Sequence, residues 1–552
     1  MRTRRFKAAF RPPTARRLMH FPRSRHSMCA PAGFGLLVLM VVLCGCQGGQ
    51  KVADESTFER MVGSAPGSPE AAPERRRGAL WYQIEANSTR LEVHVRLLDP
   101  PDRASFFLPG PWAGRTDFAD NISIQGASSN DGPVPFTISR SDGRIDVESD
   151  DAEWIQLDYA VALRHQSDER ARFHPRFADG VAFAYGPAFI VLPSEQISRQ
   201  VSDIPIEVRA PSDWRLLATW QHIRSAQSQA VEGSSVHGFM APTPGALRDA
   251  FVAAGADIEL YRPESVSGDS QLTVGFAPAM EVDRQEYGER IAQLVRAYRQ
   301  RFGDLGPATA FVRPLEEANP SRRRGVGRRG GFVVEVSETQ PLDSKTLLLL
   351  AHEAFHLWNG HHLTPEPSAE QATRWFKEGV THYLALKTLA ELGLLSREEV
   401  LRELSRAGSY YQRNPAARRR KSSTADRARL PYDKGVLLAV ALDATLLADS
   451  EGRVGLDDWV RHLIEQMGDA GNAYDAEDLR STLVEVAGTS SSRAAKLWDE
   501  HVAGAKPLEP ARVFERAGLH WLESSEQSKA RLLPVKRDKS PFGHMFPADT
   551  SQ

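Results

Sequence analysis

The spacing of apolar residues changes along the chain from a two-residue period to a helical one. In segments 90–97 (RLEVHVRL) and 154–161 (WIQLDYAV), every second residue is apolar, which predicts strands with one buried face. Pro and Gly recur between such segments, as they do in the turns of a β-sandwich. We therefore predict a β-sandwich-like domain over residues 79–265, without a catalytic cluster.

A mixed pattern of strands and helices begins near residue 271. An N-terminally capped amphipathic helix is predicted from Asp283 to Phe302. Strands are predicted at 271–278 (QLTVGFAP), 309–314 (TAFVRP) and 330–336 (GGFVVEV). These elements predict a second domain over residues 270–395.

Helices dominate the chain from residue 343 onward. Asp343 or Ser344 can cap the first of them, and Gly360 can end it. Further helices are predicted at 368–392, 398–412, 432–449, 455–467, 475–487 and 491–503. We predict a helical domain over 396–525 and a polar, poorly ordered tail over 526–552. The predicted fold class is therefore a multidomain α+β protein.

The first 45 residues have the pattern of a secretion signal. Residues 1–28 contain nine Lys or Arg and no acid, and the segment at 33–43 (GFGLLVLMVVL) is apolar for eleven residues. That is shorter than the ~20 residues of a membrane-spanning helix but fits a signal-peptide core. The Leu-Cys-Gly-Cys sequence that follows resembles a bacterial lipobox and predicts a lipid on Cys46. An uncleaved membrane anchor is the alternative, and residues 46–78 predict a flexible linker.

Removal of this signal changes the charge of the protein. The chain has 69 Lys+Arg and 71 Asp+Glu, so loss of the nine basic residues moves the net charge from −2 to −11. An acidic mature chain argues against nucleic acid as a partner. Cys29 and Cys44 fall within the signal and Cys46 would carry lipid, so any metal site must use histidine and carboxylate ligands.

The segment 351–363 (AHEAFHLWNGHHL) holds four of the sixteen histidines. His352 and His356 are one helical turn apart, so both imidazoles can face one metal ion. Glu353 lies beside them, where it can act on a water molecule rather than on the metal. This is the His-Glu-x-x-His pattern of zinc peptidases. A helix with solvated histidines is the alternative for so short a motif.

Two later segments offer the remaining groups of a zinc site, which takes three protein ligands and an open position. Glu378, in RWFKEGVTHY, follows His356 by 22 residues on the next predicted helix and is the preferred third ligand. Glu366 and Glu370, in a predicted loop, are the alternatives. Tyr432, in PYDKG at a predicted helix start, can donate a hydrogen bond to an oxyanion.

Neighbouring polar residues receive structural interpretations. Asn359 and Thr381 are candidates to hold the outer nitrogen of a histidine ligand. His361 and His362 follow the predicted helix end, where a protonated imidazole suits the helix dipole, and His382 is interpreted as a packing residue. The arginine-rich segments 321–331 and 418–421 are interpreted as solvated loops rather than as a rim for acidic peptides or lipid headgroups.

Together these residues resemble the gluzincin metallopeptidases and, more narrowly, the glycyl aminopeptidase family. The family's motifs His-Glu-x-x-His-x-Trp-Asn, Trp-x-x-Glu-Gly-x-Thr-x-Tyr and Tyr-x-Lys-Gly occur in order at 352–359, 375–383 and 432–435. Segment 106–122 (FFLPGPWAGRTDFADNI) is similar to the family's Leu-Pro-x-Trp segment, and the resemblance spans residues 80–525.

The resemblance implies a thermolysin-like catalytic domain behind a β domain. It implies that His352, His356 and Glu378 hold Zn²⁺, that Glu353 is the general base, and that Tyr432 is the donor to the transition state.

Two features depart from the family pattern. The family's edge strand usually reads Gly-Gly-x-Glu-His, whereas residues 330–334 read Gly-Gly-Phe-Val-Val. Related aminopeptidases use an acid near this strand to hold the substrate amine, and Glu335 is the residue that could substitute. Only 31 residues follow Trp521, too few for the PDZ domain that many relatives carry.

The predicted function is that of a lipid-anchored zinc metallopeptidase acting on peptides or proteins, with aminopeptidase action as its narrower form. Exopeptidase and endopeptidase action both fit the motifs. The alternatives are a non-catalytic binding or scaffold lipoprotein and a zinc hydrolase of a non-peptide substrate. The predicted location is the bacterial cell envelope, and Gln47 after the lipid-bearing cysteine favours the outer membrane of a Gram-negative host.

Overall fold

The structure is a computed structural model that describes residues 79–164, 172–223, 233–263, 271–315, 322–414, 416, 424–468, 470–488, 492–504, 506–523, 530–534 and 541–546. The predicted signal (1–45), the predicted lipid attachment site Cys46, the predicted linker (46–78) and the arginine-rich segment 418–421 lie outside these ranges. Within them, no helix combines the length and the hydropathy that a membrane crossing requires.

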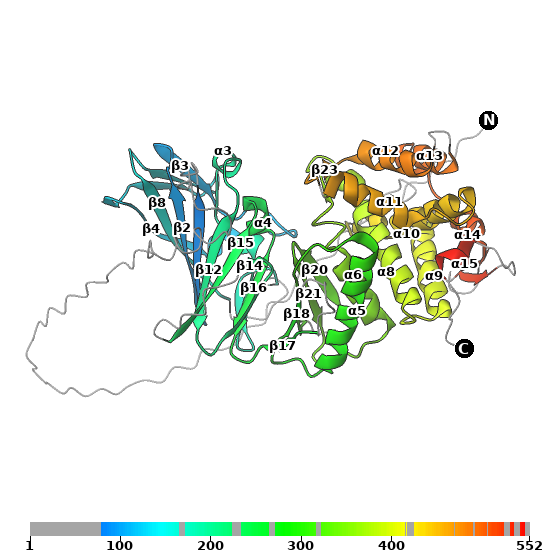
Figure 1. Cartoon of the computed structure of the whole chain (residues 1–552), viewed down its shortest axis with the longest axis horizontal. Helices are drawn as coiled ribbons and strands as arrows, with labels where there is room; N and C mark the ends of the chain where they lie inside the picture. Colours follow the sequence, from blue (N-terminus) through cyan, green and yellow to red (C-terminus); the bar gives the residue numbers. More distant parts are fainter. Residues whose placement is uncertain are drawn as a thin grey trace, which may run out of the picture. The chain divides into compact units, whose positions relative to one another are not determined.

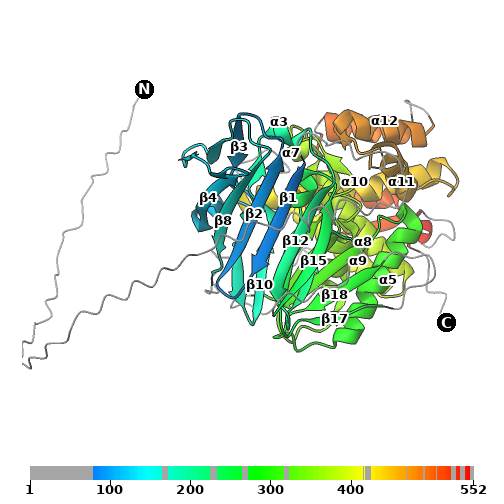
Figure 2. The ribbon, with the colours of Figure 1, turned by 60° about the vertical axis from the view of Figure 1, so that its left-hand side comes forward.

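The N-terminal domain is built from three β-sheets, with short helical segments in its connections (Figures 1 and 2). The largest has the order β14-β15-β12-β1-β2-β8-β4-β5, from Gln221–His222, Ser234–Ala241, Ile204–Pro211, Leu80–Ala86, Arg90–Leu98, Trp154–Ala162, Ile122–Ser129 and Gly132–Pro133. A second has the order β11-β3-β7-β6, from Leu192–Pro193, Arg103–Phe107, Arg144–Glu148 and Phe136–Ser139. The third has the order β13-β16-β10-β9, from Arg215–Ala218, Phe251–Gly255, Val181–Tyr185 and Arg176–Ala178. The short helices are η1 (Phe118–Asn121), α2 (Gly186–Phe189), α3 (Glu195–Ser198) and α4 (Pro244–Arg248).

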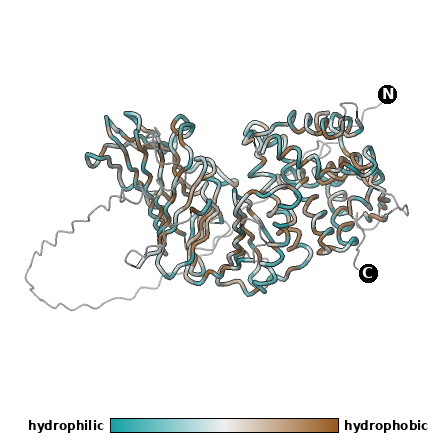
Figure 3. The backbone as a smooth tube through the Cα atoms, viewed as in Figure 1, coloured by the Kyte–Doolittle hydropathy of each residue, from teal (hydrophilic) through white to brown (hydrophobic). Residues whose placement is uncertain are grey.

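The alternating residues of β2 and β8 form the core of this domain, as their pattern predicts. Leu91 and Val93 of β2 and Ile155 and Leu157 of β8 are all buried. In Figure 3, hydrophobic and hydrophilic colours alternate along many of the described strands. The predicted mixed fold with an N-terminal β domain is thereby confirmed.

Strand β10 joins two hydrophobic cores. Its even-numbered residues, Ala182 and Ala184, pack into the core of the β domain. Its odd-numbered residues, Val181, Phe183 and Tyr185, pack into the core of the second domain, which follows it in sequence. Successive side chains of a strand point to opposite sides, so β10 contributes to both cores. It therefore holds the β domain and the second domain together.

The second domain has a five-stranded sheet covered by helices. Its order is β17-β18-β19-β21-β20, from Glu259–Tyr261, Leu272–Phe276, Ala308–Pro314, Gly331–Val336 and Arg324–Arg328. Strands β18, β19 and β21 are parallel, and β20 pairs antiparallel with β21 at the edge. Helices α5 (Arg284–Phe302) and α6 (Ser344–Phe355) pack against this sheet (Figure 1).

The edge strand is not the one expected from sequence. Segment 330–336 lies inside the sheet, and the edge is β20, which falls in the arginine-rich segment interpreted as a solvated loop. Gly330, at φ 74°, lies in the tight turn between the two strands. Two glycines within β20 weaken its strand pattern, so the sequence does not mark it.

Helices form the rest of the described chain. They are α7 (Glu370–Arg374), the π-helix η2 (Trp375–Val380), α8 (Thr381–Glu391), α9 (Arg397–Arg413), α10 (Thr424–Asp449), α11 (Leu456–Leu463), the π-helix η4 (Ile464–Gly468), α12 (Ala476–Val486), α13 (Arg493–Trp498), the π-helix η5 (Asp499–Ala503), α14 (Pro510–Arg516) and α15 (Pro541–Met545). Two short strand pairs complete it, β22 (Thr364–Pro365) with β23 (Ala473–Tyr474) and β24 (Leu519–Leu522) with β25 (Arg531–Pro534).

Two expectations about these helices are wrong. Helix α10 begins at Thr424, so Pro431 lies inside it and Tyr432 does not open it. The predicted tail contains ordered elements, since β25 pairs with β24. Phe542, Met545 and Phe546 are also buried in the main core. The polar average of the tail conceals these few apolar residues.

Candidate metal centre and active site

Helix α6 presents the two histidines of the first motif. Asp343 begins the helix, because its Oδ1 accepts a hydrogen bond from the backbone N–H of Thr346 at 2.8 Å. The helix ends at Phe355, earlier than Gly360, yet His356 keeps helical angles of φ −61° and ψ −17°. His352 and His356 therefore remain on one face, with 7% and 6% of their surface exposed.

The π-helix η2 carries the carboxylate of the second motif. Glu378 lies within Trp375–Val380, where the wider turn changes the direction of side chains relative to an α-helix. The next residue, Gly379, contacts Gly435 of α10 so closely that a Cβ atom on either would lie within 2.6 Å of the other's Cα. The absence of side chains at both positions lets α10 approach η2.

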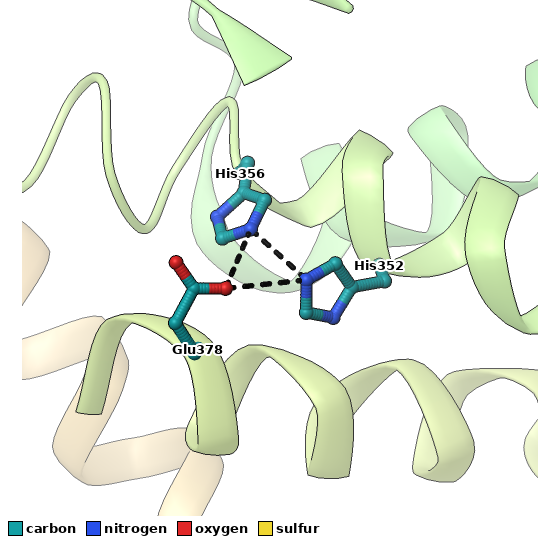
Figure 4. Close-up of side chains that lie close together, drawn as sticks. All are labelled: His352, His356 and Glu378. Carbon is teal, nitrogen blue, oxygen red and sulfur yellow. Dashed lines mark hydrogen bonds and ion pairs between the residues drawn. The ribbon is translucent and has the colours of Figure 1, made fainter. Parts of the chain in front are cut away.

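The three side chains converge on one point (Figure 4). The Nε2 atoms of His352 and His356 are 3.1 Å apart, and Oε2 of Glu378 is 3.7 Å from each. All three ligand atoms lie within 4.8 Å of one another. For bonds of about 2.1 Å, ligand atoms of a tetrahedral zinc site lie about 3.4 Å apart. The separations and the two-histidine, one-carboxylate donor set therefore fit Zn²⁺.

The charges of the triad also suit a cation. Burial alone would raise the pKa of Glu378, but the imidazoles of His352 and His356, 3.7 Å away, hold it well below its usual value. Burial lowers the pKa of His356, yet the nearby carboxylate of Glu378 outweighs burial and leaves that pKa raised. Glu378 is thus an ionised carboxylate that draws positive charge to the point where the imidazoles meet.

Asn359 holds the outer side of one ligand. Its backbone carbonyl lies 2.8 Å from Nδ1 of His356, which leaves Nε2 free to bind metal. Its side-chain Nδ2 donates to the carbonyl of Phe376 at 3.1 Å and to Oγ1 of Thr381 at 3.2 Å. Asn359 and Thr381 therefore tie the end of α6 to the segment that carries Glu378, with the contact to His356 made by backbone rather than side chain.

Glu353 lies under the edge strand. A Cβ atom on Gly325 of β20 would be 2.1 Å from Cδ of Glu353, and one on Gly327 would be 3.0 Å from Cβ of His356. Burial raises the pKa of Glu353, against the lowering effects of His352 and His356. A buried carboxylate with a raised pKa, beside the metal point, is suited to accept and release a proton.

Tyr432 faces the same point from α10. Its ring lies 6.1 Å from that of His352 at an interplanar angle of 25°. Burial raises the pKa of Tyr432 well above its usual value, and the charge and hydrogen bond of Glu378 act in the same direction. Its hydroxyl therefore stays protonated and can donate a hydrogen bond.

The acid expected to hold a substrate amine is not available. Glu335 is 2% exposed and lies within 3.4–3.8 Å of Arg172, Arg176 and Arg313. These cations neutralise it, so its suggested role as a substitute is not supported. Sequence reasoning could not detect this cluster, because two of the arginines come from the β domain.

The other acids and histidines near the motifs lie outside the metal triad and have different surroundings. Glu366 and Glu370, the alternative ligands, are exposed and outside the triad. His361 is not a charged residue at a solvated helix end, since it is buried, its Nδ1 is 2.6 Å from Oδ2 of Asp249, and burial lowers its pKa. His382 lies four residues after Glu378, with its ring 5.7 Å from that of His352. Burial lowers the pKa of His382 to about 3.

Sequence reasoning missed three contributors to the site. They are Gly325 and Gly327, which leave room for Glu353 and His356, and Asp249, which holds His361. The only sequence signal for the glycines is their alternation in RGVGR, at the spacing of one strand face. Asp249 belongs to the β domain, and nothing in the sequence around it indicates that it contacts His361.

Comparison with known proteins agrees with this geometry. Residues 345–435 match the family described as M61 glycyl aminopeptidase. A search of curated protein sequences gives no match. An aminopeptidase N family protein from Idiomarina loihiensis is similar in structure, with a TM-score of 0.66, 16% identity, and coverage of 81% of this chain and 79% of that one.

A second similar structure is an M1 zinc metallopeptidase from Deinococcus radiodurans, with a TM-score of 0.51, 15% identity, and coverage of 77% of this chain and 92% of that one. A variant of the same enzyme has been solved with the substrate Tyr-Ser-Ala, and it matches with a TM-score of 0.51, 16% identity, and coverage of 78% and 95%. At such low identities, the structural similarity shows a shared fold alone.

The matched segment contains all the residues that the motifs single out, from His352 to Tyr432. The resemblance to the glycyl aminopeptidase family is confirmed, and with it the predicted class of enzyme and its cofactor, Zn²⁺. The chain thus combines a segment that matches the M61 glycyl aminopeptidase family with a fold similar to that of M1 zinc metallopeptidases, as expected of a zinc metallopeptidase.

Proposed function

We propose that the protein hydrolyses peptide bonds, with His352, His356 and Glu378 holding Zn²⁺, Glu353 as general base and Tyr432 as donor to the oxyanion. The observation that carries this proposal is the convergence of two Nε2 atoms and one carboxylate oxygen within 4.8 Å. When bound there, Zn²⁺ would activate a water molecule and polarise the peptide carbonyl.

The chain's own residues supply the proton transfers. Glu353 takes a proton from the attacking water and passes it to the leaving amine, and its burial and raised pKa favour both steps. Tyr432 keeps its proton and donates a hydrogen bond to the oxygen of the peptide carbonyl as negative charge develops. Asn359 keeps the imidazole of His356 in the orientation that exposes Nε2.

A single pair of variants tests the mechanism. The Glu353→Gln protein should keep zinc near one equivalent per chain, because Glu353 is not a ligand, but should lose at least about 10³-fold in peptide cleavage. Glu366→Gln, which removes an exposed carboxylate from the connection that follows α6, is the matched control and should cleave normally. Cleavage by Glu353→Gln at the wild-type rate would refute the mechanism.

The lipid anchor is part of the proposal. The basic N-terminus, the apolar core at 33–43 and the lipobox-like sequence ending at Cys46 support lipid attachment and a place in the bacterial cell envelope. Fractionation of cells that express wild type and Cys46→Ser tests it. Lipid attachment requires wild type in the membrane fraction and the variant outside it.

A further inference from the structure

The edge strand β20 is anchored at one end by a residue of the β domain. Nη1 of Arg328, the last residue of β20, donates to Oδ1 of Asp249 at 3.1 Å. The backbone carbonyl of Asp249 accepts from the backbone N–H of Arg329 at 3.1 Å. Oδ2 of Asp249 lies 2.6 Å from Nδ1 of His361, in the turn that follows α6. One residue therefore joins the end of β20 to the segment behind the helix of the two histidine ligands.

Asp249 has a well-defined place in the β domain. It directly follows helix α4, which Thr243 caps by accepting from the backbone N–H of Ala246 at 3.1 Å. It lies two residues before β16, which pairs with β10, and the carbonyl of Ala250 accepts from the N–H of Gly186 at 2.8 Å. Because β10 contributes to both cores, Asp249 reaches β20 from a part of the β domain that is packed against the second domain.

The guanidinium of Arg328 has a second contact from the β domain. It lies 4.4 Å from the centroid of the Trp112 ring, within the range of a cation–π contact. Trp112 belongs to segment 106–122, which resembles the Leu-Pro-x-Trp motif, and its ring packs against Phe173 and Tyr185 at 5.0 and 5.3 Å. Arg328 is only 7% exposed, so its side chain has little freedom to move.

The anchored end of β20 also contacts the proposed general base. Burial raises the pKa of Glu353, and a hydrogen bond from the backbone of Gly327 is among the contacts that lower it. A Cβ atom on Gly325 would lie 2.1 Å from Cδ of the same carboxylate. Gly327 directly precedes Arg328, so neighbouring residues of one strand contact the base and Asp249.

The start of β20 is held separately, by α6. Nε of Arg323, directly before the strand, donates to Oγ1 of Thr346 at 2.9 Å, and its Nη2 donates to Oδ2 of Asp343 at 2.5 Å. The strand itself pairs with β21 at the edge of the sheet, and two of its five residues are glycines, which have no side chain to pack. The contacts of Asp249 therefore hold the end of the strand that lies beside Gly327.

We infer that Asp249 is a positioning residue for the general base, because it fixes the end of β20, and β20 in turn fixes the carboxylate of Glu353 beside the metal point. This inference rests on the proposed peptidase function and makes catalysis depend on a β-domain residue outside the three motifs. A displacement near 1 Å at a reacting group costs about 10²-fold in rate. Loss of Asp249 should lower kcat, whereas the three ligands on α6 and η2 should still bind zinc.

Four proteins test this inference, namely wild type, Asp249→Ala, Arg328→Gln and the double variant. Zinc content, kcat and KM are measured with one peptide, and amide hydrogen exchange of residues 324–329 is measured on the same zinc-loaded proteins. We expect each single substitution to lower kcat about 10- to 100-fold and to speed this exchange about tenfold or more, with zinc content and KM near wild type. Because both residues act through one contact, the double variant should lose no more kcat than Asp249→Ala alone.

Matched controls separate positioning from a general loosening of the two domains. Thr309→Val removes another hydrogen bond between them, which the Thr309 hydroxyl on β19 donates to the carbonyl of Ala218 at 3.1 Å. Asp213→Ala removes an exposed aspartate of the β domain. Both should keep kcat and the exchange of residues 324–329 near wild type. Asp249→Asn, which keeps one side-chain oxygen as an acceptor, should lose less kcat than Asp249→Ala.

The outcomes separate this inference from the proposed function. Unchanged exchange of residues 324–329 in Asp249→Ala would overturn the inference. An equal loss of kcat in Thr309→Val would overturn it as well, because both losses would then reflect looser domains. If wild type cleaves no peptide, the peptidase function fails, and faster exchange of β20 in Asp249→Ala would still support the anchoring of the strand.

Discussion

Gly379 and Gly435 bring the second and third motifs into contact. A Cβ atom on Gly379 would lie 2.2 Å from Cα of Gly435, and one on Gly435 would lie 2.2 Å from the carbonyl oxygen of Trp375. Gly379 directly follows the ligand Glu378, and Gly435 follows Tyr432 by three residues. The distance between ligand and hydroxyl donor is thus set by two residues that carry no chemistry.

We predict that Gly435→Ala lowers kcat more than it lowers zinc affinity. The added methyl group pushes α10 away from η2, which moves Tyr432, whereas the three ligands stay on α6 and η2. Zinc titration and peptide cleavage measure the two effects. Gly288→Ala on α5 is the control, because its methyl group would lie 2.3 Å from the ring of Tyr261 on β17, away from the site. If both variants lose kcat equally, the effect is general destabilisation.

Gly325→Ala should impair the base. Its methyl group would overlap the carboxylate of Glu353, with Cδ at 2.1 Å, so either the edge strand or the side chain must move. A displacement near 1 Å at a reacting group costs about 10²-fold in rate. Steady-state cleavage beside Gly126→Ala, where a Cβ atom meets nothing within 4 Å, gives the comparison. Unchanged cleavage by Gly325→Ala would show that β20 can yield freely.

Removal of the Tyr432 hydroxyl should slow turnover without loss of metal. Tyr432→Phe keeps the ring that packs near His352 and deletes only the donor. Loss of one oxyanion donor typically costs about 10²–10³-fold in kcat. Zinc content and KM should stay near wild type, and a variant that loses zinc instead would indicate a role in holding Glu378.

Acid should weaken the contact that Asp249 makes with His361 and Arg328. Burial would raise the pKa of Asp249, but these two partners hold it far below its usual value. A lowered carboxyl pKa stabilises the folded state above the unfolded value of about 3.9, and this stability is lost as the pH falls through the folded pKa. Asp249→Asn lacks this contribution at every pH.

The measurement compares the free energies of unfolding of metal-free wild type and Asp249→Asn between pH 7 and pH 3. Metal-free protein removes the separate effect of acid on zinc binding. The difference between the two proteins should be constant at neutral pH and should shrink below about pH 4. A difference that does not change with pH would mean that the charge of Asp249 contributes nothing to stability.

The buried Lys387 should be sensitive to loss of charge balance. Its Nζ lies 2.7 Å from Oδ2 of Asp457 and 3.3 Å from Oδ2 of Asp443, which is fully buried and also accepts from Tyr383 at 2.6 Å. Lys387→Met leaves the carboxylates uncompensated and should cost about 3–5 kcal/mol in the free energy of unfolding. Denaturant titration should show that adding Asp443→Asn recovers part of this loss.

Local sequence patterns predict the local structure well and the site in outline. The capped helix from Asp283, the strands at 90–97 and 154–161, and the convergence of His352, His356 and Glu378 all follow from periodicity and motif spacing. Each depends on residues that are neighbours along one element or lie on two consecutive elements. The interactions that determine these features therefore act between residues that are close in the sequence.

The features that the sequence does not predict arise from contacts between distant segments. The family motif places the edge strand at 330–336, and the sequence does not mark β20 as a strand because it contains two glycines. The contacts of these glycines with Glu353 and His356 explain why they are there. In the sequence Glu335 has no neighbouring cation that marks it as paired. In the structure it forms ion pairs with Arg172 and Arg176 of the β domain. The described part of the tail is held by Phe542 and Phe546. These two residues are buried in the same core as residues from helices far earlier in the sequence.

The packing of this last segment also shows how far the site depends on residues outside its motifs. Phe546 contacts the ring of Tyr383, whose hydroxyl donates to Asp443 of α10. Helix α15 also packs against α10, the helix that carries Tyr432. A chain truncated before residue 541 would therefore keep every motif residue and still lose contacts that hold the helices beside the metal point.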